Sequence, residues 1–568
     1  MADRKSSGGS QRLVRTAAEV FGWSELRPGQ LAAMEAVMRG RDTLAVMPTG
    51  AGKSAVYQVP GLLLSGPTVV VSPLIALQRD QIAGLLSHDG APEAVAVNSA
   101  QAAGEVEAAW EAVRHGAAEF LFLSPEQLAK DEVVERLAEV APSLFVVDEA
   151  QCVTAWGHDF RPDYLRLAQA VQRVGRPPVL ALTATAAPPV REEIVERLCM
   201  ADPALVVAGF DRPNIALEVH RFLDDTDKRR VVVERAAGEP KPGLVYTATR
   251  RDAEAYADDL AALGLSAAAY HAGLTAGERS RVHDAFLAGE TDVVVATSAF
   301  GMGIDKEDVR FVLHASVPGS LDAYYQEIGR AGRDGGPAVA VLHYRTEDSG
   351  LQRLFATRAP DEDTLSAVAE RIHERDAAAP DDIAKDTGLT RRRVTAAVNL
   401  LEQAGTVHTD DDGRVRAVAG TTAEKAAARA AEEAESRRRL EQSRLAMMLG
   451  YAETTGCRRR FLLGYFGEPY DAPCGTCDMC ATHESESESE GSVVDGVGGT
   501  SEEPSSPAAA PYAAGTRVRH TEWGEGTVMS EEGDRVTVLF ESMGYRTLSL
   551  TAIAGKDLLS AAPPPARS

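Results

Sequence analysis

From Thr43 to about Tyr344 the chain alternates short, uninterrupted apolar runs with stretches of helical periodicity. Apolar runs of about 4–8 residues without polar alternation are typical of strands buried on both faces of a parallel sheet. A chain of 568 residues is too long for one hydrophobic core, so several domains are expected. The pattern predicts an α/β fold with two parallel-sheet lobes, residues 1–208 and 209–350, that meet near Gly209–Asn214.

The apolar runs expected to form the strands of the first lobe are Thr43–Met47, Thr68–Ser72, Phe120–Leu123, Leu144–Val147 and Val179–Leu182. Those expected in the second lobe are Leu244–Tyr246, Ala267–Tyr270, Val293–Ala296, Phe311–His314 and Ala338–Leu342. Parallel strands end at a common edge of their sheet, and ligands bind at that edge. Polar motifs that directly follow these runs are therefore the candidates for a binding site.

A glycine-rich loop follows the first run and opens a helical stretch. The residues of this loop expected to contact a nucleotide are Thr49, Gly50, Gly52, Lys53 and Ser54. Backbone N–H groups of such a loop bind phosphates, while Lys53 supplies a cation to the β- and γ-phosphates of ATP and Ser54 a hydroxyl to Mg²⁺. The strict pattern has glycine where Met47 stands, so this loop is a variant. The alternative is a glycine-rich turn without a ligand.

Two carboxylates, Asp148 and Glu149, directly follow the run Leu144–Val147. Asp148 is suited to the coordination shell of Mg²⁺, and Glu149 to orienting and deprotonating an attacking water. Without Lys53 the pair would be read as the solvated start of a helix. Together with Lys53 it predicts a site for ATP hydrolysis.

Two arginines, Arg330 and Arg333, lie in the run Gly329-Arg-Ala-Gly-Arg333 of the second lobe. Guanidinium groups at the interface of two lobes would stabilise charge on the γ-phosphate and make hydrolysis depend on closure of the lobes. The alternative is ordinary ion pairing at the surface.

These motifs together resemble those of the RecQ family of DNA helicases, which belongs to superfamily two, from about Phe21 to Tyr344 and again around the cysteines. The resemblance implies RecA-like lobes. It also implies that Trp23 and the Arg27 guanidinium sandwich the adenine of ATP while Gln30 contacts the edge of the base. Further segments that resemble the DNA-binding and coupling motifs of the family are Val71–Gln81, Thr183–Thr185, Tyr270–Gly273 and Ala296–Asp305, the last with Asp305 among the nucleotide-binding residues.

The segment Ala155–Tyr164 resembles the aromatic-rich loop by which the family couples single-stranded DNA to ATP hydrolysis. Its residues expected to contact DNA are Trp156, His158, Phe160 and Arg161. Aromatic rings interleaved with cationic groups form a stacking platform for bases, although packing of the rings in the core is the alternative. Gln151 stands where the family usually has His, and Ala155 where it usually has Gln. Both departures lie between the expected nucleotide and DNA sites.

Four of the six cysteines, Cys457, Cys474, Cys477 and Cys480, form a cluster with two tight steps of two intervening residues. Four thiolates with this spacing predict a closed, tetrahedral, structural Zn²⁺ site, and the flanking residues resemble the RecQ zinc module. Cys152 and Cys199 are isolated, so the cysteines indicate a metal site in a reducing cytosol and not a disulfide framework. A cytoplasmic, nucleoid-associated protein is therefore expected.

A helix, a glycine turn and a second helix from Ile383 to Ala404, followed by a hairpin pattern, predict a winged helix over residues 360–420. Arg391, Arg392 and Arg393 on its second helix favour DNA binding. The zinc module is expected at 421–482. Typical family members place zinc before the winged helix, so this order is a departure, and the winged helix could instead be a dimer or partner surface.

Residues 483–514, rich in Ser, Glu, Gly and Pro, are expected to be a disordered acidic linker. Alternating strands at 515–560 predict a small SH3- or Tudor-like barrel that resembles the one ending some superfamily-one repair helicases. That resemblance implies a protein partner, RNA polymerase or a repair protein, whereas a solubilising or vestigial barrel is an equal alternative. We expect this barrel to be tethered and to move independently of the motor.

The net charge of −25 argues against a protein that coats nucleic acid, but the acid is unevenly placed, with runs at Glu484–Glu490 and Glu502–Glu503. Basic clusters at Arg391–Arg393, Arg437–Arg439 and Arg458–Arg460 leave room for a confined DNA track. No apolar run reaches membrane-spanning length, and no membrane partner is expected. The sequence predicts an ATP- and Mg²⁺-dependent DNA helicase of recombination and repair, with the 3′→5′ polarity implied by the resemblance. The rivals are a translocase that does not separate strands and a DNA-bound adaptor with an inactive motor.

Overall fold

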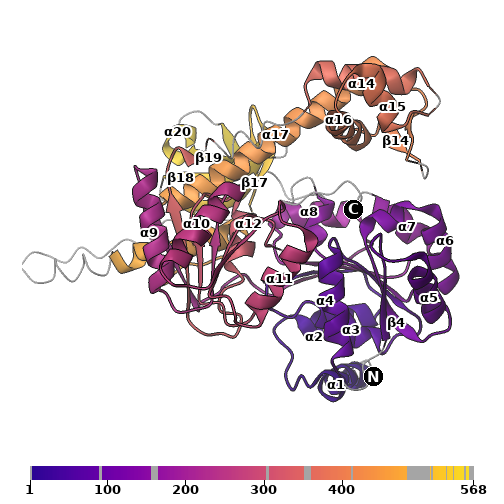
Figure 1. The fold of residues 1–568 in the computed structure, drawn as a ribbon, viewed down its shortest axis with the longest axis horizontal. Coiled ribbons are helices and arrows are strands. Elements are labelled where there is room, and N and C mark those ends of the chain that lie inside the picture. The colour runs from indigo at the N-terminus through magenta and orange to yellow at the C-terminus, as the bar shows by residue number, and fades with distance from the viewer. Residues whose placement is uncertain are drawn as a thin grey trace, which may run out of the picture. The chain divides into compact units, whose positions relative to one another are not determined.

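The computed structural model describes residues 3–561 except 89–92, 155–163, 165, 302–305, 349, 351–359, 376, 411–412, 483–511, 513–515, 533, 541–542 and 555–557. The chain divides into two compact units (Figure 1). The first combines Met1–Gly209 with Thr357–Arg438, and the second combines Phe210–Ala356 with Arg439–Ser568. Each lobe is therefore grouped with a different part of the C-terminal half. No helix in the described part of the chain is both long enough and apolar enough to cross a membrane.

The first unit contains a parallel sheet with the strand order β3-β4-β2-β5-β6-β1-β7. Its strands are β1 (Thr43–Val46), β2 (Thr68–Val71), β3 (Glu93–Val97), β4 (Ala118–Leu123), β5 (Leu144–Val147), β6 (Val179–Thr183) and β7 (Ala204–Val207). The five strands predicted for this lobe are confirmed, since β1, β2, β4, β5 and β6 are wholly or almost wholly buried. The edge strands β3 and β7, which are partly exposed, were not predicted.

Helices and short 3-10 turns connect these strands. They are α1 (Asp3–Phe21), α2 (Gln30–Met38), α3 (Ala55–Gly61), α4 (Ile75–Leu86), α5 (Ala103–Arg114), η1 (Pro125–Ala129), α6 (Asp131–Val140), η2 (Ala150–Val153), α7 (Leu167–Arg173) and α8 (Pro188–Arg197). One core cluster of the lobe joins apolar residues of α1, α2 and α3 to those of β1, β4 and β5.

The first unit also contains the winged helix, formed by α14 (Glu362–His373), α15 (Pro380–Thr387), α16 (Arg391–Gln403) and the antiparallel pair β14 (Val407–Thr409) and β15 (Val415–Ala417). Thr390 caps α16 by accepting a hydrogen bond from the Arg393 N–H. The hairpin contacts the first lobe, because Arg166 pairs with Glu402 at 3.2 Å and donates to the Thr409 carbonyl at 2.9 Å. The winged helix thus has a core of its own and a polar contact with the lobe.

The second unit contains a parallel sheet with the strand order β10-β11-β9-β12-β13-β8. Its strands are β8 (Ile215–Arg221), β9 (Gly243–Tyr246), β10 (Ala267–Tyr270), β11 (Val293–Ala296), β12 (Phe311–His314) and β13 (Ala338–Tyr344). The accompanying helices are α9 (Asp225–Gly238), α10 (Arg250–Ala262), α11 (Ala276–Leu287) and α12 (Leu321–Ile328). The strands predicted for this lobe are confirmed, whereas β8 at its edge was not predicted.

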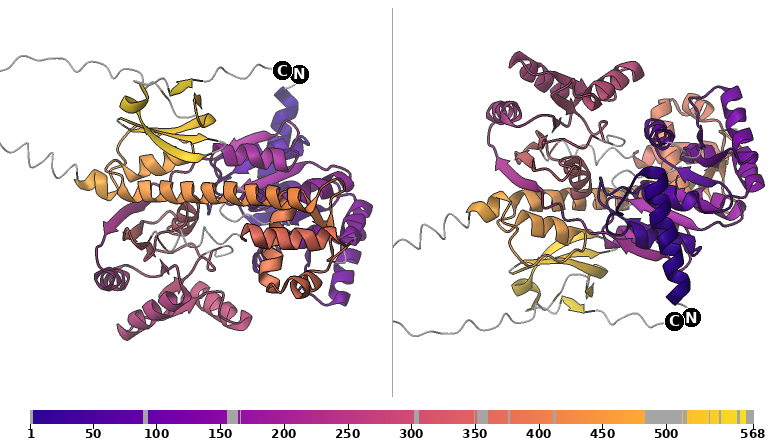
Figure 2. Two further views of the ribbon diagram at one scale, coloured as in Figure 1. Left: turned by 90° about the horizontal axis from the view of Figure 1, so that it is seen from above. Right: turned by 90° about the horizontal axis from the view of Figure 1, so that it is seen from below.

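The remainder of the second unit is a helical zinc module and an antiparallel sheet. The long helix α17 (Ala423–Glu453) begins in the first unit and ends in the second, and α18 (Arg458–Tyr465) follows it (Figure 2). The antiparallel sheet has the order β19-β18-β17-β16-β20. Its elements are β16 (Arg517–His520), β17 (Gly524–Glu532), β18 (Arg535–Phe540), β19 (Gly544–Ser549), α20 (Leu550–Ala554) and β20 (Leu559–Ala561). The predicted acidic linker lies outside the described residues, apart from Tyr512.

A buried carboxylate, Asp42, joins the start of β1 to its neighbours in the first lobe. Its oxygens accept hydrogen bonds from the Arg176 guanidinium and from the N–H groups of Val179 and Ala201. Burial alone would raise the pKa of Asp42, but these hydrogen bonds and the charge of Arg176 outweigh it and lower that pKa. The ionised carboxylate is therefore the form that the fold stabilises.

We predict that Asp42→Ala lowers the free energy of unfolding at pH 7 by roughly 3 kcal/mol, because it leaves a guanidinium and two buried N–H groups without their acceptor. Folding lowers the pKa of Asp42. Its contribution to the free energy of unfolding is therefore complete above the ordinary carboxylate pKa and is lost as the pH falls through the lowered pKa. The free energies of unfolding of wild type and of Asp42→Asn should therefore become more similar below about pH 4.

Urea denaturation of both variants across pH checks this prediction. The control is Glu132→Ala, which removes the ion pair with Arg136 on the surface of the same lobe, where Glu132 is 77% exposed. It should cost less than about 1 kcal/mol. Equal losses in the Asp42 and Glu132 variants would contradict the structural role of Asp42.

Candidate ATP and zinc sites

The predicted phosphate loop lies at the carboxyl end of β1 and leads into α3. Gly50 and Gly52 have positive φ angles of 81° and 71°, which a residue with a side chain rarely adopts. A Cβ atom on Gly52 would also lie 2.7 Å from the Gln30 side-chain nitrogen. Lys53 and Ser54 are half-buried at the end of this loop. The glycines thus allow a compact turn that leaves both side chains within reach of a phosphate.

The Gln30 side chain holds the phosphate loop through hydrogen bonds to its backbone. Its Nε2 donates to the carbonyls of Ala51 and Gly52, both at 2.9 Å, and its Oε1 accepts from the Arg27 N–H at 2.8 Å. Its amide therefore fixes the loop relative to the segment that precedes α2. The resemblance implied contact with adenine, so this supporting role is an addition that the sequence did not indicate.

Trp23 and Arg27 lie in the segment just before Gln30. The Trp23 ring is half-buried and stacks on Phe21, with ring centroids 4.5 Å apart at 14°. Arg27 is exposed. One face of the indole is therefore already covered by Phe21, and the expected adenine contact would use its other face.

The two carboxylates Asp148 and Glu149 follow β5 and lie at the same edge of the sheet as the phosphate loop. Asp148 is buried, and its two oxygens accept hydrogen bonds from the Gln81 side chain at 2.9 Å and the Glu149 N–H at 3.0 Å. Burial, and next the charge of Glu149, raise the pKa of Asp148 to about 6, although Lys53 and Gln81 act in the opposite direction. The charge of Lys53 thus acts on Asp148, so the phosphate loop and the carboxylates belong to one site.

These residues fit Mg²⁺ and ATP. A hard divalent cation prefers oxygen ligands such as the Asp148 carboxylate and the Ser54 hydroxyl, and its charge would keep the buried carboxylate ionised. Glu149 is in the left-handed region with φ 49°, an uncommon conformation for a residue other than glycine. Strain of this kind is frequent where a side chain must be aimed at a reacting group.

Gln151, which replaces the usual His, links the carboxylates to the end of β6. Its Nε2 donates to a Glu149 oxygen at 2.9 Å, and its Oε1 accepts from the Thr183 hydroxyl at 2.6 Å. Thr183 begins the Thr183–Thr185 motif that the resemblance assigned to coupling. Gln151 therefore supplies a continuous hydrogen-bonded path from Glu149 to Thr183.

Arg330 and Arg333 lie in the loop after α12, in the second unit. Arg330 is buried, and in the described part of the chain its Nε has no hydrogen-bond partner. Burial raises the pKa of Tyr246 to about 12. The positive charge of Arg330 acts in the opposite direction, because its guanidinium lies close to the Tyr246 hydroxyl. A buried guanidinium with a spare donor is suited to bind an anionic ligand.

The loop that carries these arginines is held by two residues that the sequence did not single out. Arg212 donates to the carbonyls of Ala331 and Gly332, at 2.8 and 2.9 Å, and Asn214 donates to Gly332 as well. A Cβ atom on Gly332 would lie 2.4 Å from the Asn214 side-chain nitrogen, so only glycine fits. In the sequence, only the polar run that follows Phe210 at the boundary between the lobes could have pointed to Arg212 and Asn214.

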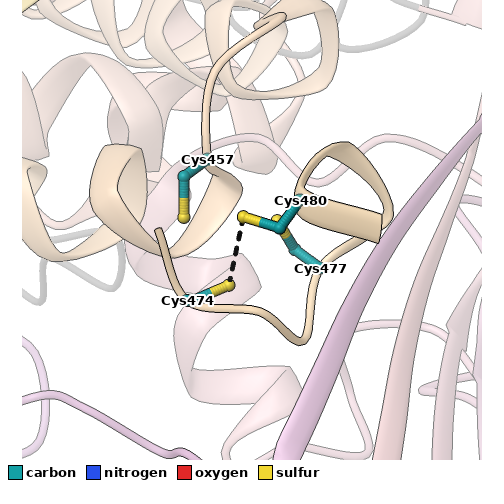
Figure 3. Close-up of side chains that lie close together, drawn as sticks. All are labelled: Cys457, Cys474, Cys477 and Cys480. Atoms are coloured by element: carbon teal, nitrogen blue, oxygen red, sulfur yellow. Dashed lines mark hydrogen bonds between the residues drawn. The ribbon is translucent and has the colours of Figure 1, made fainter. Parts of the chain in front are cut away.

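The four predicted zinc ligands form a cluster in the second unit. Their sulfur atoms all lie within 4.8 Å of one another and point inward, as Figure 3 shows for Cys457, Cys474, Cys477 and Cys480. The Cys474 and Cys480 sulfurs are 3.9 Å apart. Tetrahedral Zn²⁺ with Zn–S bonds of about 2.3 Å needs sulfurs separated by about 3.8 Å. The donor set therefore fits a closed structural zinc site.

Two members of the basic cluster Arg458–Arg460 beside the zinc ligands are buried, so they are not available to an exposed DNA track. Arg458 is 3% exposed and donates to Asp478 at 2.6 Å, while Arg459 is 4% exposed and donates to the Ile215 carbonyl at 2.7 Å. Asp478 in turn accepts from the Val219 N–H of β8. These arginines attach the zinc module to the edge of the second lobe's sheet.

The residues expected in the DNA-coupling loop, Trp156, His158, Phe160 and Arg161, lie outside the described residues, as does Asp305. The three arginines of the winged helix are exposed on α16. Arg391 pairs with Asp381 at 3.1 Å, and Arg393 with Asp361 at 2.9 Å. Exposed pairs of this kind are weak, so phosphate could replace these carboxylates.

Comparison with protein families assigns the two lobes to the helicase class. Residues 27–194 match the DEAD/DEAH box helicase family, and residues 227–335 match the helicase conserved C-terminal domain. Residues 416–481 match the RecQ zinc-binding family, and residues 513–556 match a family described as a protein of unknown function (DUF3553). The two lobes and the nucleotide-binding elements thus define a superfamily-two helicase.

The chain is 35% identical over 475 residues to the probable ATP-dependent DNA helicase RecS of Bacillus subtilis (strain 168), covering 83% of this chain and 91% of that protein. It is 33% identical to the ATP-dependent DNA helicase RecQ of Pasteurella multocida (strain Pm70) over 81% of this chain and 61% of that protein. The chain belongs to the RecQ family of ATP-dependent DNA helicases. It spans less than two thirds of the length of the Pasteurella relative.

A similar fold is found in the crystal structure of the DUF1998 helicase MrfA bound to DNA. The TM-score is 0.51 at 17% sequence identity, and the match covers 73% of this chain and 63% of that one. The likeness concerns the fold alone.

We predict that Gln151→Ala lowers kcat for ATP hydrolysis between about tenfold and a hundredfold with little change in KM, because Glu149 loses the partner that orients it. Gln151→His, which restores the residue usual in the family, should retain most of the activity. Steady-state ATPase assays with saturating single-stranded DNA measure both values. Wild-type kcat in the alanine variant would mean that Gln151 only fills space.

We also predict one Zn²⁺ per chain, measured by elemental analysis of protein purified without chelators. Cys477→Ser should lose the metal and lower thermal stability and solubility, because a structural thiolate site contributes folding energy locally. Cys199→Ser is the control, since Cys199 is exposed and lies outside the cluster. Protein that is folded but free of zinc would refute the site.

Proposed function

We propose that the protein couples hydrolysis of ATP with Mg²⁺ to unwinding of duplex DNA, moving 3′→5′, and that it acts in recombination and repair at the nucleoid. The observation that carries the proposal is the common edge of the parallel sheet, where the phosphate loop with Lys53 follows β1 and the buried Asp148, with Glu149 beside it, follows β5. A phosphate-binding cation, a magnesium ligand and a general base are the groups that hydrolysis of a nucleoside triphosphate requires.

In the proposed reaction Lys53 and the loop amides bind the β- and γ-phosphates, and Ser54 and Asp148 hold Mg²⁺. Glu149, oriented by Gln151, accepts a proton from the attacking water. Arg330 and Arg333 stabilise the negative charge on the γ-phosphate when the lobes close. Trp23 and Arg27 hold the adenine, and Asp305 contributes to the nucleotide site.

The DNA-contacting residues belong to the same proposal. Bases of the translocating strand stack on Trp156 and Phe160 while His158 and Arg161 supply polar and cationic contacts. Arg391, Arg392 and Arg393 bind the phosphates of duplex DNA through the winged helix. The aromatic-rich segment follows η2, which contains Gln151, so a signal from DNA would reach Glu149 over few residues.

Two rivals make different predictions. A DNA-bound adaptor with an inactive motor would show no ATP hydrolysis stimulated by DNA, and the intact set of Lys53, Asp148 and Glu149 argues against it. A translocase would hydrolyse ATP on DNA without separating strands. The proposal also includes a protein partner of the C-terminal barrel, RNA polymerase or a repair protein.

The test is a strand-displacement assay on duplexes with a 3′ tail, a 5′ tail or a fork, with ATP and Mg²⁺. We expect unwinding of the 3′-tailed and forked substrates and little of the 5′-tailed one. Lys53→Ala should abolish hydrolysis and unwinding but bind DNA nearly as wild type does, because the phosphate loop and the DNA track are separate. ATP hydrolysis without displacement would favour the translocase, and wild-type hydrolysis by Lys53→Ala would refute the assigned site.

A further inference from the structure

The C-terminal barrel packs against the zinc module and is not a freely moving attachment, so the sequence-based expectation of an independent barrel was wrong. Figure 2 shows the barrel strands, in yellow, beside the C-terminal part of α17. Both segments belong to the second unit. The barrel has an apolar core of its own, which includes Val518, Val538 and Phe540. It contacts the rest of the unit through β17, which lies against α18, and at the start of β19.

The barrel approaches α17 closely at Gly544. A Cβ atom on this glycine would lie 2.2 Å from the Ser443 Oγ and 2.7 Å from the Ser443 Cβ. Ser443 is buried, and its hydroxyl donates to the Leu440 carbonyl within α17 at 2.8 Å. Position 544 therefore admits only glycine while the barrel remains docked on the helix.

The next residue, Tyr545, reaches from the barrel into the interior of the second unit. Its ring is buried and lies 5.2 Å from the ring of Tyr465, the last residue of α18. The Tyr465 hydroxyl donates to the Asp322 carboxylate, which is buried as well. The barrel, the zinc module and the second lobe thus meet in one buried polar cluster of two phenols and a carboxylate.

Asp322 belongs to α12, and α12 is attached to the zinc module along its length. Besides the contact of Asp322 with Tyr465, the Tyr324 hydroxyl lies 3.2 Å from that of Tyr451, and the Tyr325 ring lies 4.8 Å from that of Phe466. Arg330 and Arg333 directly follow the end of this helix. The position of α12 therefore determines where the arginine loop begins.

We propose that the DUF3553 barrel is an internal brace of the motor, in which Gly544 and Tyr545 hold α12 through Tyr465 and Asp322 and so position the loop that carries Arg330 and Arg333. The inference assigns a role to a domain described only as having unknown function. Its catalytic consequence rests on the proposed function, whereas its structural consequence does not. Tyr545 and Gly544 are positioning residues, since they touch neither nucleotide nor DNA in this scheme.

The test uses full-length protein with Gly544→Ala, which pushes a methyl group into Ser443 and should undock the barrel. The matched control is Gly524→Ala in the same barrel. Gly524 has a similar positive φ, 80° against 68° for Gly544, but a Cβ atom there would meet nothing within 4 Å. Both variants place alanine at a similar positive φ, so the difference between them reports mainly the contact with α17. Ser443→Gly removes the atoms that clash and should rescue Gly544→Ala in the double variant.

Two measurements are made on each variant. Hydrogen–deuterium exchange of the peptide Leu321–Ile328 reports the packing of α12 without reference to activity. Steady-state kinetics report the arginine loop, where we expect kcat of the DNA-stimulated ATPase to fall at least about tenfold at nearly unchanged KM for ATP. A mere loss of folded protein would also lower the apparent kcat at unchanged KM, so kcat is calculated per folded enzyme, with the folded fraction of each variant measured by circular dichroism.

We expect faster exchange of α12 and lower kcat in Gly544→Ala, wild-type behaviour in Gly524→Ala, and recovery in Gly544→Ala with Ser443→Gly. If Gly544→Ala proves insoluble, Tyr545→Ala removes the buried ring without a clash and should give the same two effects. Unchanged exchange of α12 in these variants would overturn the brace. Absence of DNA-stimulated hydrolysis in the wild type would instead overturn the proposed function and leave the exchange result valid.

Discussion

The parallel register of the first lobe's sheet is the constraint on which its site depends. Val46 of β1 pairs with Thr183 of β6, and Val147 of β5 pairs with Ala181 of β6, so these strands end side by side. Groups that are far apart in sequence, Lys53 after β1 and Asp148 after β5, consequently share one edge. Their electrostatic coupling exists because the sheet excludes water from the carboxylate.

In the second unit the corresponding constraint is that α12, and the loop after it with Arg330 and Arg333, are held in place by neighbouring residues. The loop carbonyls are held by Arg212 and Asn214 from the junction of the lobes, and the helix is held by aromatic residues of the zinc module. Guanidinium groups stabilise developing charge only when they are positioned in advance, since reorganisation would consume much of the interaction energy. In the proposed mechanism the zinc module and the barrel therefore affect catalysis through packing, although neither contains a nucleotide-binding motif.

Sequence patterns predicted the inner strands of both sheets and the edge strand β10, but not the edge strands β3, β7 and β8. Inner strands of a parallel sheet are covered on both faces and read as continuous apolar runs, as in Leu144–Val147. The missed strands lie at sheet edges, and Ala204–Val207 alternates between half-buried and exposed residues. Their pairing is decided by a neighbouring strand, so no local signal distinguishes them from loops. The same limit applies to Arg458 and Arg459, whose composition suggests a basic surface while burial against Asp478 and Asp211 makes them structural.

The sequence by itself determined the order of the motifs, the chemistry of the nucleotide and zinc ligands, and the two-lobed fold, because these follow from residue type and from spacing along one chain. Tertiary structure decided which groups act on one another. That Gln151 joins Glu149 to Thr183, that Gln30 supports the phosphate loop, and that Tyr545 of the barrel reaches a residue of α12 all depend on contacts between segments remote in sequence. Such contacts are fixed by close packing of buried side chains, and a linear pattern does not record that packing.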